Sequence, residues 1–283
     1  MNLAQTFEAV RLSTVGFASK FVVTPLGSKP VFPPIIGTGF VVDRRGLIAT
    51  NRHVAEELLK LPPNPKTGAP SAMAIVWTEV QKMPGGQALP LLFIDVKDGG
   101  FLTSFSSDTP FYGESVPDIA FVQLNVQDLP ALPLATEENS WPVGTAVGTA
   151  GFPLGTAPLT LYGRVNQISP FLRHGIVSSV YPFPCAFPHG FTIDVTTQGG
   201  ASGSPIFLAD KPIVIGMIEA IVTEAPNITI AVPSSLIASA LAEYTKGKDL
   251  DVSGVPTIEE FARQSERSDK LEWESFLTVR RSP

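Results

Sequence analysis

Ser202 is the residue of this chain best placed to act as a nucleophile. It lies in a run of small residues at 199–205, Gly-Gly-Ala-Ser-Gly-Ser-Pro, which directly precedes an apolar run at 206–208. Because glycine adopts backbone angles that other residues resist, this run predicts a tight loop that presents one hydroxyl. The amides of Gly200 and Ser202 can point to the same side of the loop, where they would hold an oxyanion.

A serine hydroxyl needs a general base, and the chain offers His53 and Asp118 upstream of Ser202. His53 lies in Thr-Asn-Arg-His-Val at 50–54, and Asp118 lies in Val-Pro-Asp-Ile-Ala at 116–120. An imidazole can remove the hydroxyl proton during attack, and a carboxylate at its other nitrogen fixes the tautomer and stabilises the imidazolium. These residues predict a catalytic triad, with a purely structural Asp118 as the alternative.

The order His, Asp, Ser and three short motifs resemble the trypsin-like serine proteases. The motifs are T-x-x-H-V around His53, D-I-A around Asp118 and G-x-S-G-S-P around Ser202. Gly-Phe-Pro-Leu-Gly at 151–155 and His-Gly-Ile-Val-Ser at 174–178 are similar to the HtrA-type branch. The resemblance covers roughly residues 20 to 245 and implies a serine endopeptidase that forms an acyl-enzyme on Ser202.

The fold that this resemblance implies is all-β, with two six-stranded antiparallel β-barrels of the chymotrypsin type and short N- and C-terminal helices. Short β-prone runs between Pro, Gly and Asp residues fit this fold. They lie at 21–23, 39–42, 47–49, 74–77, 91–94, 144–150, 159–165, 175–177, 191–195, 213–218 and 228–232.

The expected domain boundaries follow from these runs. We expect an N-terminal helical segment at 1–19, a protease domain at 20–247 and a helical tail at 248–283. Within the protease domain, barrel one would span about 20–125, barrel two about 140–233, and a C-terminal helix 234–247. That helix would be capped by Ser234 and stopped by Gly247.

Two regions lie outside the motifs. The insert at 56–115 contains polar or Pro/Gly-rich stretches at 61–68 and 98–114, which either border the substrate cleft or are surface decoration. The tail is too short for the PDZ domain that HtrA-type proteins usually append. It predicts helices at 257–267 and 269–279, which either pack on the body of the protein or bind a partner.

The resemblance also implies a substrate pocket that differs from that of trypsin. Thr196, six positions before Ser202, would lie near the base of the pocket for the P1 side chain, where trypsin has an acid. Ile228 on a later strand would shorten this pocket. We therefore expect small or medium aliphatic P1 residues rather than Lys or Arg.

Glu219 and Ala220 would form the wall of the pocket beside Asp118. If Glu219 pointed inward it could favour a basic P1 residue, or like-charge repulsion could raise a carboxyl pKa. We expect it to point outward to solvent. A second departure is Ala201, where pancreatic enzymes carry an Asp that pairs with a new N-terminus after cleavage, so activation by N-terminal processing is not expected.

Composition and charge exclude several other classes of function. The net charge is −6 and no block of Lys and Arg occurs, so no nucleic acid partner is expected. No run of 18 or more apolar residues occurs, which predicts no membrane span. His174, His189 and Cys185 form no metal-spaced cluster, so neither a metal nor another cofactor is expected, and Cys185 is predicted to be a buried, inert thiol.

The partner expected from the motifs is a protein or peptide substrate, and the oligomeric state is left open. The N-terminus has no signal-peptide pattern and the chain has a single cysteine, which favours a cytoplasmic protein. A second hypothesis is a protease-fold binding or scaffold protein with a closed or inactive site. Intact His53, Asp118, Ser202 and Gly200 favour the enzyme.

Overall fold

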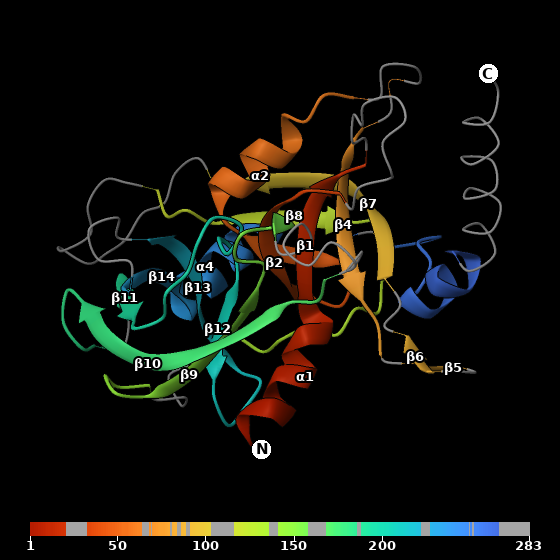
Figure 1. Cartoon of the computed structure of the whole chain (residues 1–283). Helices are drawn as coiled ribbons and strands as arrows, with labels where there is room; N and C mark the ends of the chain where they lie inside the picture. The colour runs from red at the N-terminus through yellow and green to blue at the C-terminus, as the bar shows by residue number, and fades with distance from the viewer. Residues whose placement is uncertain are drawn as a thin grey trace.

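The chain folds into two β-barrels that lie side by side, with helices packed around them (Figure 1). A computed structural model describes residues 1–20, 33–63, 68, 70–79, 81–83, 86–88, 91–102, 116–135, 141–157, 168–185, 188–221, 227–248, 250 and 252–265. The runs at 21–23 and 159–165, which were expected to be strands, lie outside these residues, as does the tail helix expected at 269–279.

Barrel one is a closed antiparallel sheet of six strands. In hydrogen-bonding order these are β1 (Thr14–Ser19), β2 (Ile35–Asp43), β3 (Leu47–Thr50), β8 (Ala120–Leu124), β7 (Leu91–Phe101) and β4 (Ala72–Trp77). Beside it, β5 (Gln81–Met83) and β6 (Gly86–Ala88) form a separate two-stranded ladder.

Barrel two is also closed, antiparallel and six-stranded. Its strands in hydrogen-bonding order are β10 (Phe171–Tyr181), β11 (Gly190–Ile193), β14 (Thr229–Pro233), β13 (Val214–Ile221), β12 (Pro205–Leu208) and β9 (Ala146–Gly151). The predicted all-β fold with two six-stranded barrels of the chymotrypsin type is therefore confirmed.

Terminal helices close the seam between the barrels. Helix α1 (Leu3–Ser13) and helix α4 (Ser234–Thr245) contribute Val10 and Ile237 to an apolar cluster that also contains Phe40 of barrel one and Phe207 of barrel two. These four side chains are buried, so both helices belong to the core rather than to its periphery. The expected short N- and C-terminal helices are thus present.

The first barrel begins earlier than expected. The chain leaves α1 at Ser13 and enters β1 at Thr14, so the boundary expected between residues 19 and 20 falls after the first strand. The sequence signal was weak because β1 is buried on both faces, with Thr14, Val15, Gly16, Phe17 and Ala18 all inaccessible. A strand of this kind lacks the alternation of apolar and polar residues that marks a half-buried strand.

Two smaller expectations are wrong. The N-cap of α4 is Pro233, and Ser234 donates its hydroxyl to the Ala135 carbonyl instead of capping the helix. Gly247 does follow the helix end with a positive φ of 71°. Cys185 is exposed rather than buried, since it lies beyond the end of β10, in a segment where Phe183 is also exposed.

The first part of the tail packs on barrel one. Residues 258–265 form a helix, and Ile258, Phe261 and Ala262 contact the apolar interior cluster of that barrel. The Gln127 side chain donates to the Val255 carbonyl and so ties the preceding segment to the same barrel. This part of the tail therefore covers the body of the protein.

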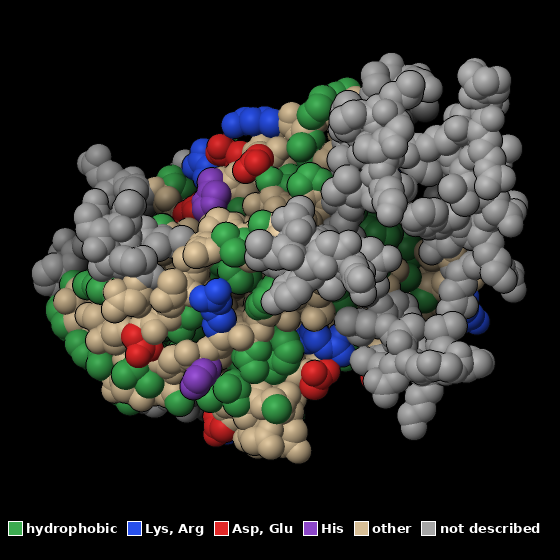
Figure 2. All heavy atoms as spheres, in the orientation of Figure 1, with side chains coloured by type: hydrophobic (Ala, Val, Ile, Leu, Met, Phe, Trp, Pro, Cys, Tyr) green, Lys and Arg blue, Asp and Glu red, His purple; other side chains and the backbone are tan. Residues whose placement is uncertain are grey.

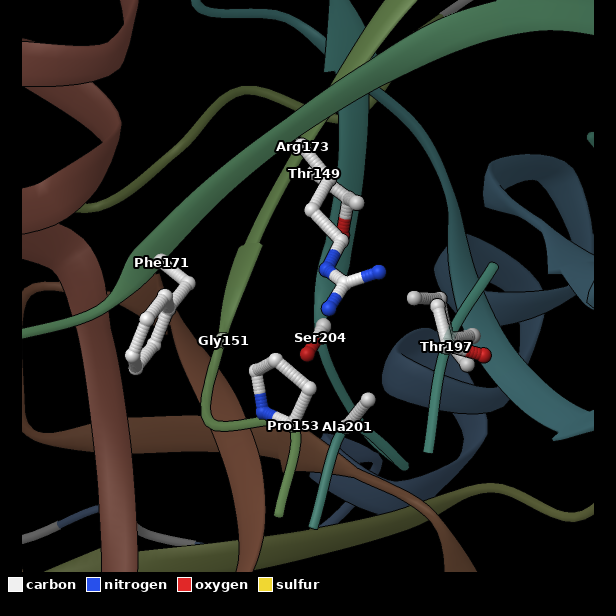
Figure 3. Close-up of a pocket in the computed structure, with 9 residues that line it drawn as sticks. Thr149, Gly151, Pro153, Phe171, Arg173, Thr197, Ala201 and Ser204 are labelled. Carbon is white, nitrogen blue, oxygen red and sulfur yellow. The ribbon is translucent and has the colours of Figure 1, made fainter. Parts of the chain in front are cut away.

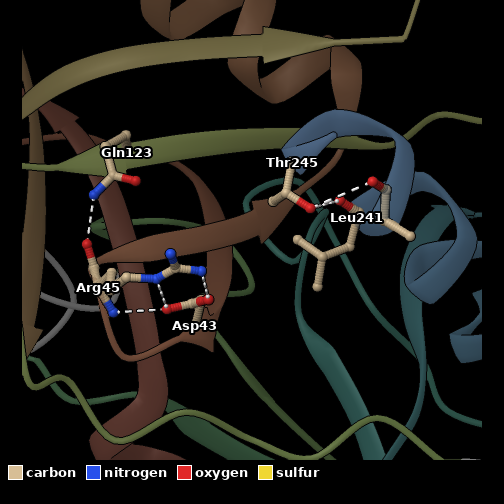
Figure 4. Close-up of polar contacts among 6 residues, drawn as sticks. Asp43, Arg45, Gln123, Leu241 and Thr245 are labelled. Atoms are coloured by element: carbon tan, nitrogen blue, oxygen red, sulfur yellow. Dashed lines mark hydrogen bonds and ion pairs between the residues drawn. The ribbon is translucent and has the colours of Figure 1, made fainter. Parts of the chain in front are cut away.

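A short turn holds β3 and β8 in the register that the site requires. Asp43 accepts hydrogen bonds from the backbone and guanidinium of Arg45, and Gln123 donates to the Arg45 carbonyl at 2.6 Å (Figure 4). The Arg45 guanidinium also keeps the pKa of Asp43 below its ordinary value. The β2–β3 turn is thereby tied to β8, the strand that pairs with β3.

Candidate active site

His53 and Asp118 meet because the strands that carry them are neighbours in barrel one. Thr50, the last residue of β3, pairs with Ala120, the first residue of β8. His53 lies in the first turn of helix α2 (Arg52–Leu59), directly after β3, and Asp118 lies just before β8. The pairing of two strand ends therefore places the imidazole beside the carboxylate.

The Asp118 carboxylate holds His53 by two contacts. Its Oδ2 lies 2.6 Å from the Nδ1 atom of the ring, and its Oδ1 accepts the backbone N–H of His53 at 3.0 Å. The Asn51 side chain in turn donates to the Asp118 carbonyl at 3.0 Å. With Nδ1 facing a carboxylate, the neutral ring carries its proton there and leaves Nε2 as the basic nitrogen.

The charge of Asp118 also sets the basicity of His53. The pKa of His53 is raised above its ordinary value, chiefly by the hydrogen bond to Asp118. Burial opposes this shift, while the negative charges of Asp118, Glu57 and Glu219 add to it. The site therefore stabilises the imidazolium form, which is the form that a general base adopts after it has taken a proton.

The loop that carries Ser202 is fastened to barrel one by Thr38. The Thr38 N–H donates to the Ser202 carbonyl at 2.9 Å, and the Thr38 hydroxyl donates to the Gly200 carbonyl at 2.8 Å. Thr50 donates its own hydroxyl to the Thr38 carbonyl at 2.7 Å. Since Thr50 ends the strand that leads to His53, Ser202 and His53 are attached to the same pair of threonines.

The geometry of this loop depends on glycine at position 200. Gly200 has a φ of +92°, and a Cβ atom there would lie 2.4 Å from the Phe152 carbonyl oxygen. The preceding peptide is fixed because the Leu154 N–H donates to the Gly199 carbonyl at 2.7 Å. A side chain at position 200 is therefore excluded both by the backbone angle and by the space.

Two amides of the loop are available to a ligand. Within the part of the chain that the structure describes, neither the Gly200 N–H nor the Ser202 N–H donates a hydrogen bond, whereas the Ala201 N–H between them donates to the Gln198 carbonyl at 3.1 Å. The Gly200 and Ser202 amides are the two donors that the sequence predicted for an oxyanion hole.

We expect Thr38→Val to slow the reaction of Ser202 by about 10- to 100-fold, because a small displacement of an oxyanion donor has effects of this size. Valine keeps the shape of threonine but cannot donate to Gly200 or accept the Phe152 N–H, which contacts the Thr38 hydroxyl at 3.3 Å. The free energy of unfolding should also fall by about 1–3 kcal/mol.

The measurement is the second-order rate of labelling by a fluorophosphonate, together with thermal unfolding. Thr245→Val is the matched control, since the Thr245 hydroxyl donates to the Leu241 carbonyl at the end of α4, away from the loop (Figure 4). An unchanged labelling rate in Thr38→Val would show that the hydroxyl does not position Gly200.

The four residues expected to form the P1 pocket are not equally buried. The Thr196 and Ala220 side chains are exposed, whereas Glu219 and Ile228 are half-buried. Residues 222–226, between Ala220 and Ile228, lie outside the described residues. None of the four lines the small hollow beside the nucleophile loop, whose walls include Ile218 as well as Thr197 and Ala201, which are labelled in Figure 3. Thr196 takes part only through its carbonyl, which accepts a hydrogen bond from Arg173.

Glu219 differs from the expectation that it points outward to solvent. It lies at an irregularity of β13 between Ile218 and Ala220 and is half-buried. Its pKa is raised, first by burial and then by the negative charge of Asp118, while His53 lowers it. The carboxyl group is thus close enough to Asp118 and His53 to sense both charges.

Thr38, Thr50 and Asn51 were not predicted as site residues, although all three lie in motifs. Thr38 stands between two glycines at 37–39, and Thr50 and Asn51 directly precede the histidine motif. A threonine flanked by two glycines is the signal that could have identified Thr38. The structure shows why Gly37 has no side chain: a Cβ atom there would lie 2.6 Å from the Val54 side chain.

Comparison with known families agrees with this geometry. Residues 37–217 match the family model of the trypsin-like peptidase domain. The chain belongs to this family. That match covers parts of both barrels and includes His53, Asp118 and Ser202. As a member of the trypsin-like peptidases, the protein is a serine protease by family.

Solved structures of HtrA-type proteases have the same fold. The HtrA-type protease AlgW with a decapeptide superposes with a TM-score of 0.52 at 15% identity, over 87% of this chain and 69% of that chain. AlgW with a tripeptide gives a TM-score of 0.52 at 15% identity, over 88% of this chain and 65% of that chain. This chain therefore spans about two thirds of the length of these neighbours. A search of curated proteins found no significant match.

Two further observations concern the distribution of charge on the surface and the length of the helices. On the face shown in Figure 2, basic side chains are scattered among apolar and acidic ones rather than gathered into one patch. No helix among the described residues is long and apolar enough to cross a membrane.

Proposed function

We propose that the protein is a serine endopeptidase in which Ser202 is the nucleophile, His53 the general base and Asp118 the residue that orients the base. The observation that carries this proposal is the 2.6 Å contact between Asp118 and His53 Nδ1 beside a loop whose Gly200 and Ser202 amides are unused. The family match and the order of the three residues along the chain support the same roles.

The proposed reaction uses these groups in two stages. His53 Nε2 takes the proton of Ser202 Oγ as this oxygen attacks the peptide carbonyl, and the Gly200 and Ser202 amides hold the resulting oxyanion. The imidazolium then gives the proton to the leaving amine, and the C–N bond breaks to leave an acyl-enzyme. A water molecule, deprotonated by His53, hydrolyses the ester and restores Ser202.

A strand edge beside Ser202 supports a peptide substrate. Strand β13 pairs with β12 as far as Met217, and Ile218 exchanges backbone hydrogen bonds with the loop at Gly203 and Ser204. Beyond Ile218, β13 continues to pair with β14 alone among the described strands. A peptide that adds to this edge as an antiparallel strand would bring its scissile bond to Ser202. The AlgW structures contain a decapeptide and a tripeptide, which is consistent with this class of ligand.

We further propose that small or medium aliphatic P1 residues such as Ala and Val are preferred. The support is the absence of an acid at Thr196 and the half-buried Ile228. Digestion of a mixed peptide library, analysed by mass spectrometry, should give cleavage mainly after these residues. Cleavage mainly after Lys or Arg would contradict the proposal and would identify Glu219 as the specificity determinant. Absence of any cleavage would favour the scaffold hypothesis.

The rate should depend on pH through His53, because only the neutral ring can accept the proton of Ser202. We expect kcat/KM to rise with pH up to the raised pKa of His53 and then to level off. Glu57→Gln and Glu219→Gln each remove a negative charge that raises this pKa, so both variants should shift the acid limb of the profile to lower pH.

Glu243→Gln on α4 is the control, and its pH profile should match that of the wild type. An acid limb that stays in place in both the Glu57→Gln and the Glu219→Gln variants would contradict the assignment of His53 as the base.

The free energy of unfolding should depend on pH through the same group. Because the folded-state pKa of His53 is raised, its contribution to stability is fully present below the ordinary value of 6.5 and is lost as the pH rises through the folded-state pKa.

A further inference from the structure

A small hollow lies beside the nucleophile loop. Its walls come from strands β9 and β10 and from the loop, with Thr149, Arg173 and Ser204 among the lining residues (Figure 3). Its cavity volume is about 10 Å³, and the hollow is partly open to solvent. A volume of this size holds roughly one water molecule, so the hollow suits only a ligand of about that size.

Two of the lining side chains are buried hydroxyls without a partner. Thr149 is 3% exposed and Ser204 is 1% exposed, and neither Oγ1 of Thr149 nor Oγ of Ser204 has a hydrogen-bond partner among the described residues. Buried hydroxyls are nearly always hydrogen-bonded, because an unpaired one has lost its water without compensation. The two hydroxyls therefore provide two unused donors at one place.

Arg173 supplies positive charge to the same hollow. Its guanidinium extends from β10 toward Ser204 in Figure 3, and it donates one hydrogen bond to the Thr196 carbonyl of the nucleophile loop. A guanidinium has five N–H donors, and Arg173 makes no ion pair within the described residues. Since no acidic residue is among those that line the hollow, the local charge is positive.

We propose that this hollow binds a small monatomic anion, a halide such as chloride. Arg173 would supply the charge, and the Thr149 and Ser204 hydroxyls would each donate a hydrogen bond. The bound anion would connect β9, β10 and the nucleophile loop through Arg173 and Ser204. It would thereby favour the loop conformation in which the Gly200 and Ser202 amides are presented, a consequence that rests on the proposed function.

Thermal unfolding tests the binding without any assay of activity. Wild-type protein is unfolded in increasing sodium chloride, with sodium gluconate added to keep the ionic strength constant, since gluconate is too large for the hollow. A saturable rise in Tm is expected. At an anion concentration ten times Kd the ratio of folded to unfolded protein should increase about 11-fold.

The rise should be lost in Arg173→Gln and retained in the control Arg44→Gln, because Arg44 is an exposed residue that pairs with Asp128. No saturable rise in the wild type, or the same rise in Arg173→Gln, would overturn the proposal and leave a hollow that holds only water.

Thr149→Val and Ser204→Ala provide a second test, in case Arg173→Gln does not fold. Neither hydroxyl has a hydrogen-bond partner in the part of the chain that the structure describes, so in gluconate alone neither substitution should lower Tm by the amount that loss of a buried hydrogen bond causes. In chloride both variants should bind the anion at least several-fold more weakly than the wild type. Unchanged affinity in both would contradict the proposed role of the hydroxyls.

The effect on the active site is measured separately by the rate of fluorophosphonate labelling at Ser202. Chloride should accelerate labelling of the wild type over the same concentration range that raises its Tm. A rise in Tm without faster labelling would retain the anion site and refute its link to the nucleophile loop. If Ser202 is never labelled while Tm still rises, the proposed function fails and the anion site stands.

Discussion

Replacement of Ser202 with Ala is expected to lower kcat for peptide hydrolysis by about 10⁴- to 10⁶-fold, to the level that remains without a nucleophile. The hydroxyl oxygen is the atom that would form the acyl-enzyme, and alanine has no atom that could replace it. The Thr38 contact to the Ser202 carbonyl is a backbone bond, so it should persist in the variant. Thermal unfolding should therefore remain close to that of the wild type.

Ser239→Ala is the matched control for this substitution. Ser239 is an exposed residue of α4 whose hydroxyl donates to the Ser235 carbonyl within the helix, so hydrolysis should be unchanged. Hydrolysis of a quenched fluorescent peptide mixture by purified variants is the measurement. If the Ser202→Ala variant retains more than a small fraction of the activity, Ser202 is not the nucleophile and the acyl-enzyme mechanism is wrong.

Asp118→Asn is expected to lower kcat by about 10⁴-fold, the size of effect seen when a triad carboxylate becomes an amide. In the wild type, the Asp118 carboxylate accepts hydrogen bonds from both the backbone N–H and the Nδ1–H of His53. The amide can satisfy the backbone N–H with its oxygen, but its NH₂ group then faces Nδ1 and favours the tautomer with the proton on Nε2. A ring in that tautomer cannot accept the proton of Ser202.

The residual activity of Asp118→Asn should also have a shifted pH profile. Asp118 is the largest cause of the raised pKa of His53, so its loss should move the acid limb to lower pH. Asp128→Asn is the control, because Asp128 is an exposed partner of Arg44. A loss of activity similar to that of the control would mean that Asp118 has only a structural role.

The positions of His53 and Asp118 could be anticipated because the motif of His53 directly follows one apolar run and the motif of Asp118 directly precedes another. Leu47–Ala49 and Ala120–Leu124 are apolar runs with obvious strand character, and their pairing follows once the barrel is assumed. The Gly-rich run around Ser202 likewise predicts a loop. Local sequence and the family resemblance therefore indicated the candidate site to within a few residues.

Other features depend on contacts between distant segments, which single-sequence patterns do not encode. The burial of Glu219 follows from an irregularity in the pairing of β13 with β14, and nothing in its neighbours along the chain distinguishes it from an outward-facing residue. The hollow beside the nucleophile loop combines Thr149, Arg173 and Ser204 from three separate strands or loops. Strand β1 was missed because its burial on both faces removed the alternating pattern.

Mapping of a fluorophosphonate adduct by mass spectrometry tests the central claim most directly. This reagent reacts only with a serine whose base and oxyanion donors are assembled, so it reports the site without knowledge of the substrate. The account predicts one adduct per chain, located on Ser202 and lost in His53→Ala. Folded wild-type protein that stays unlabelled, or that is labelled at another serine, would contradict the assignment of Ser202, His53 and Asp118 as the catalytic residues.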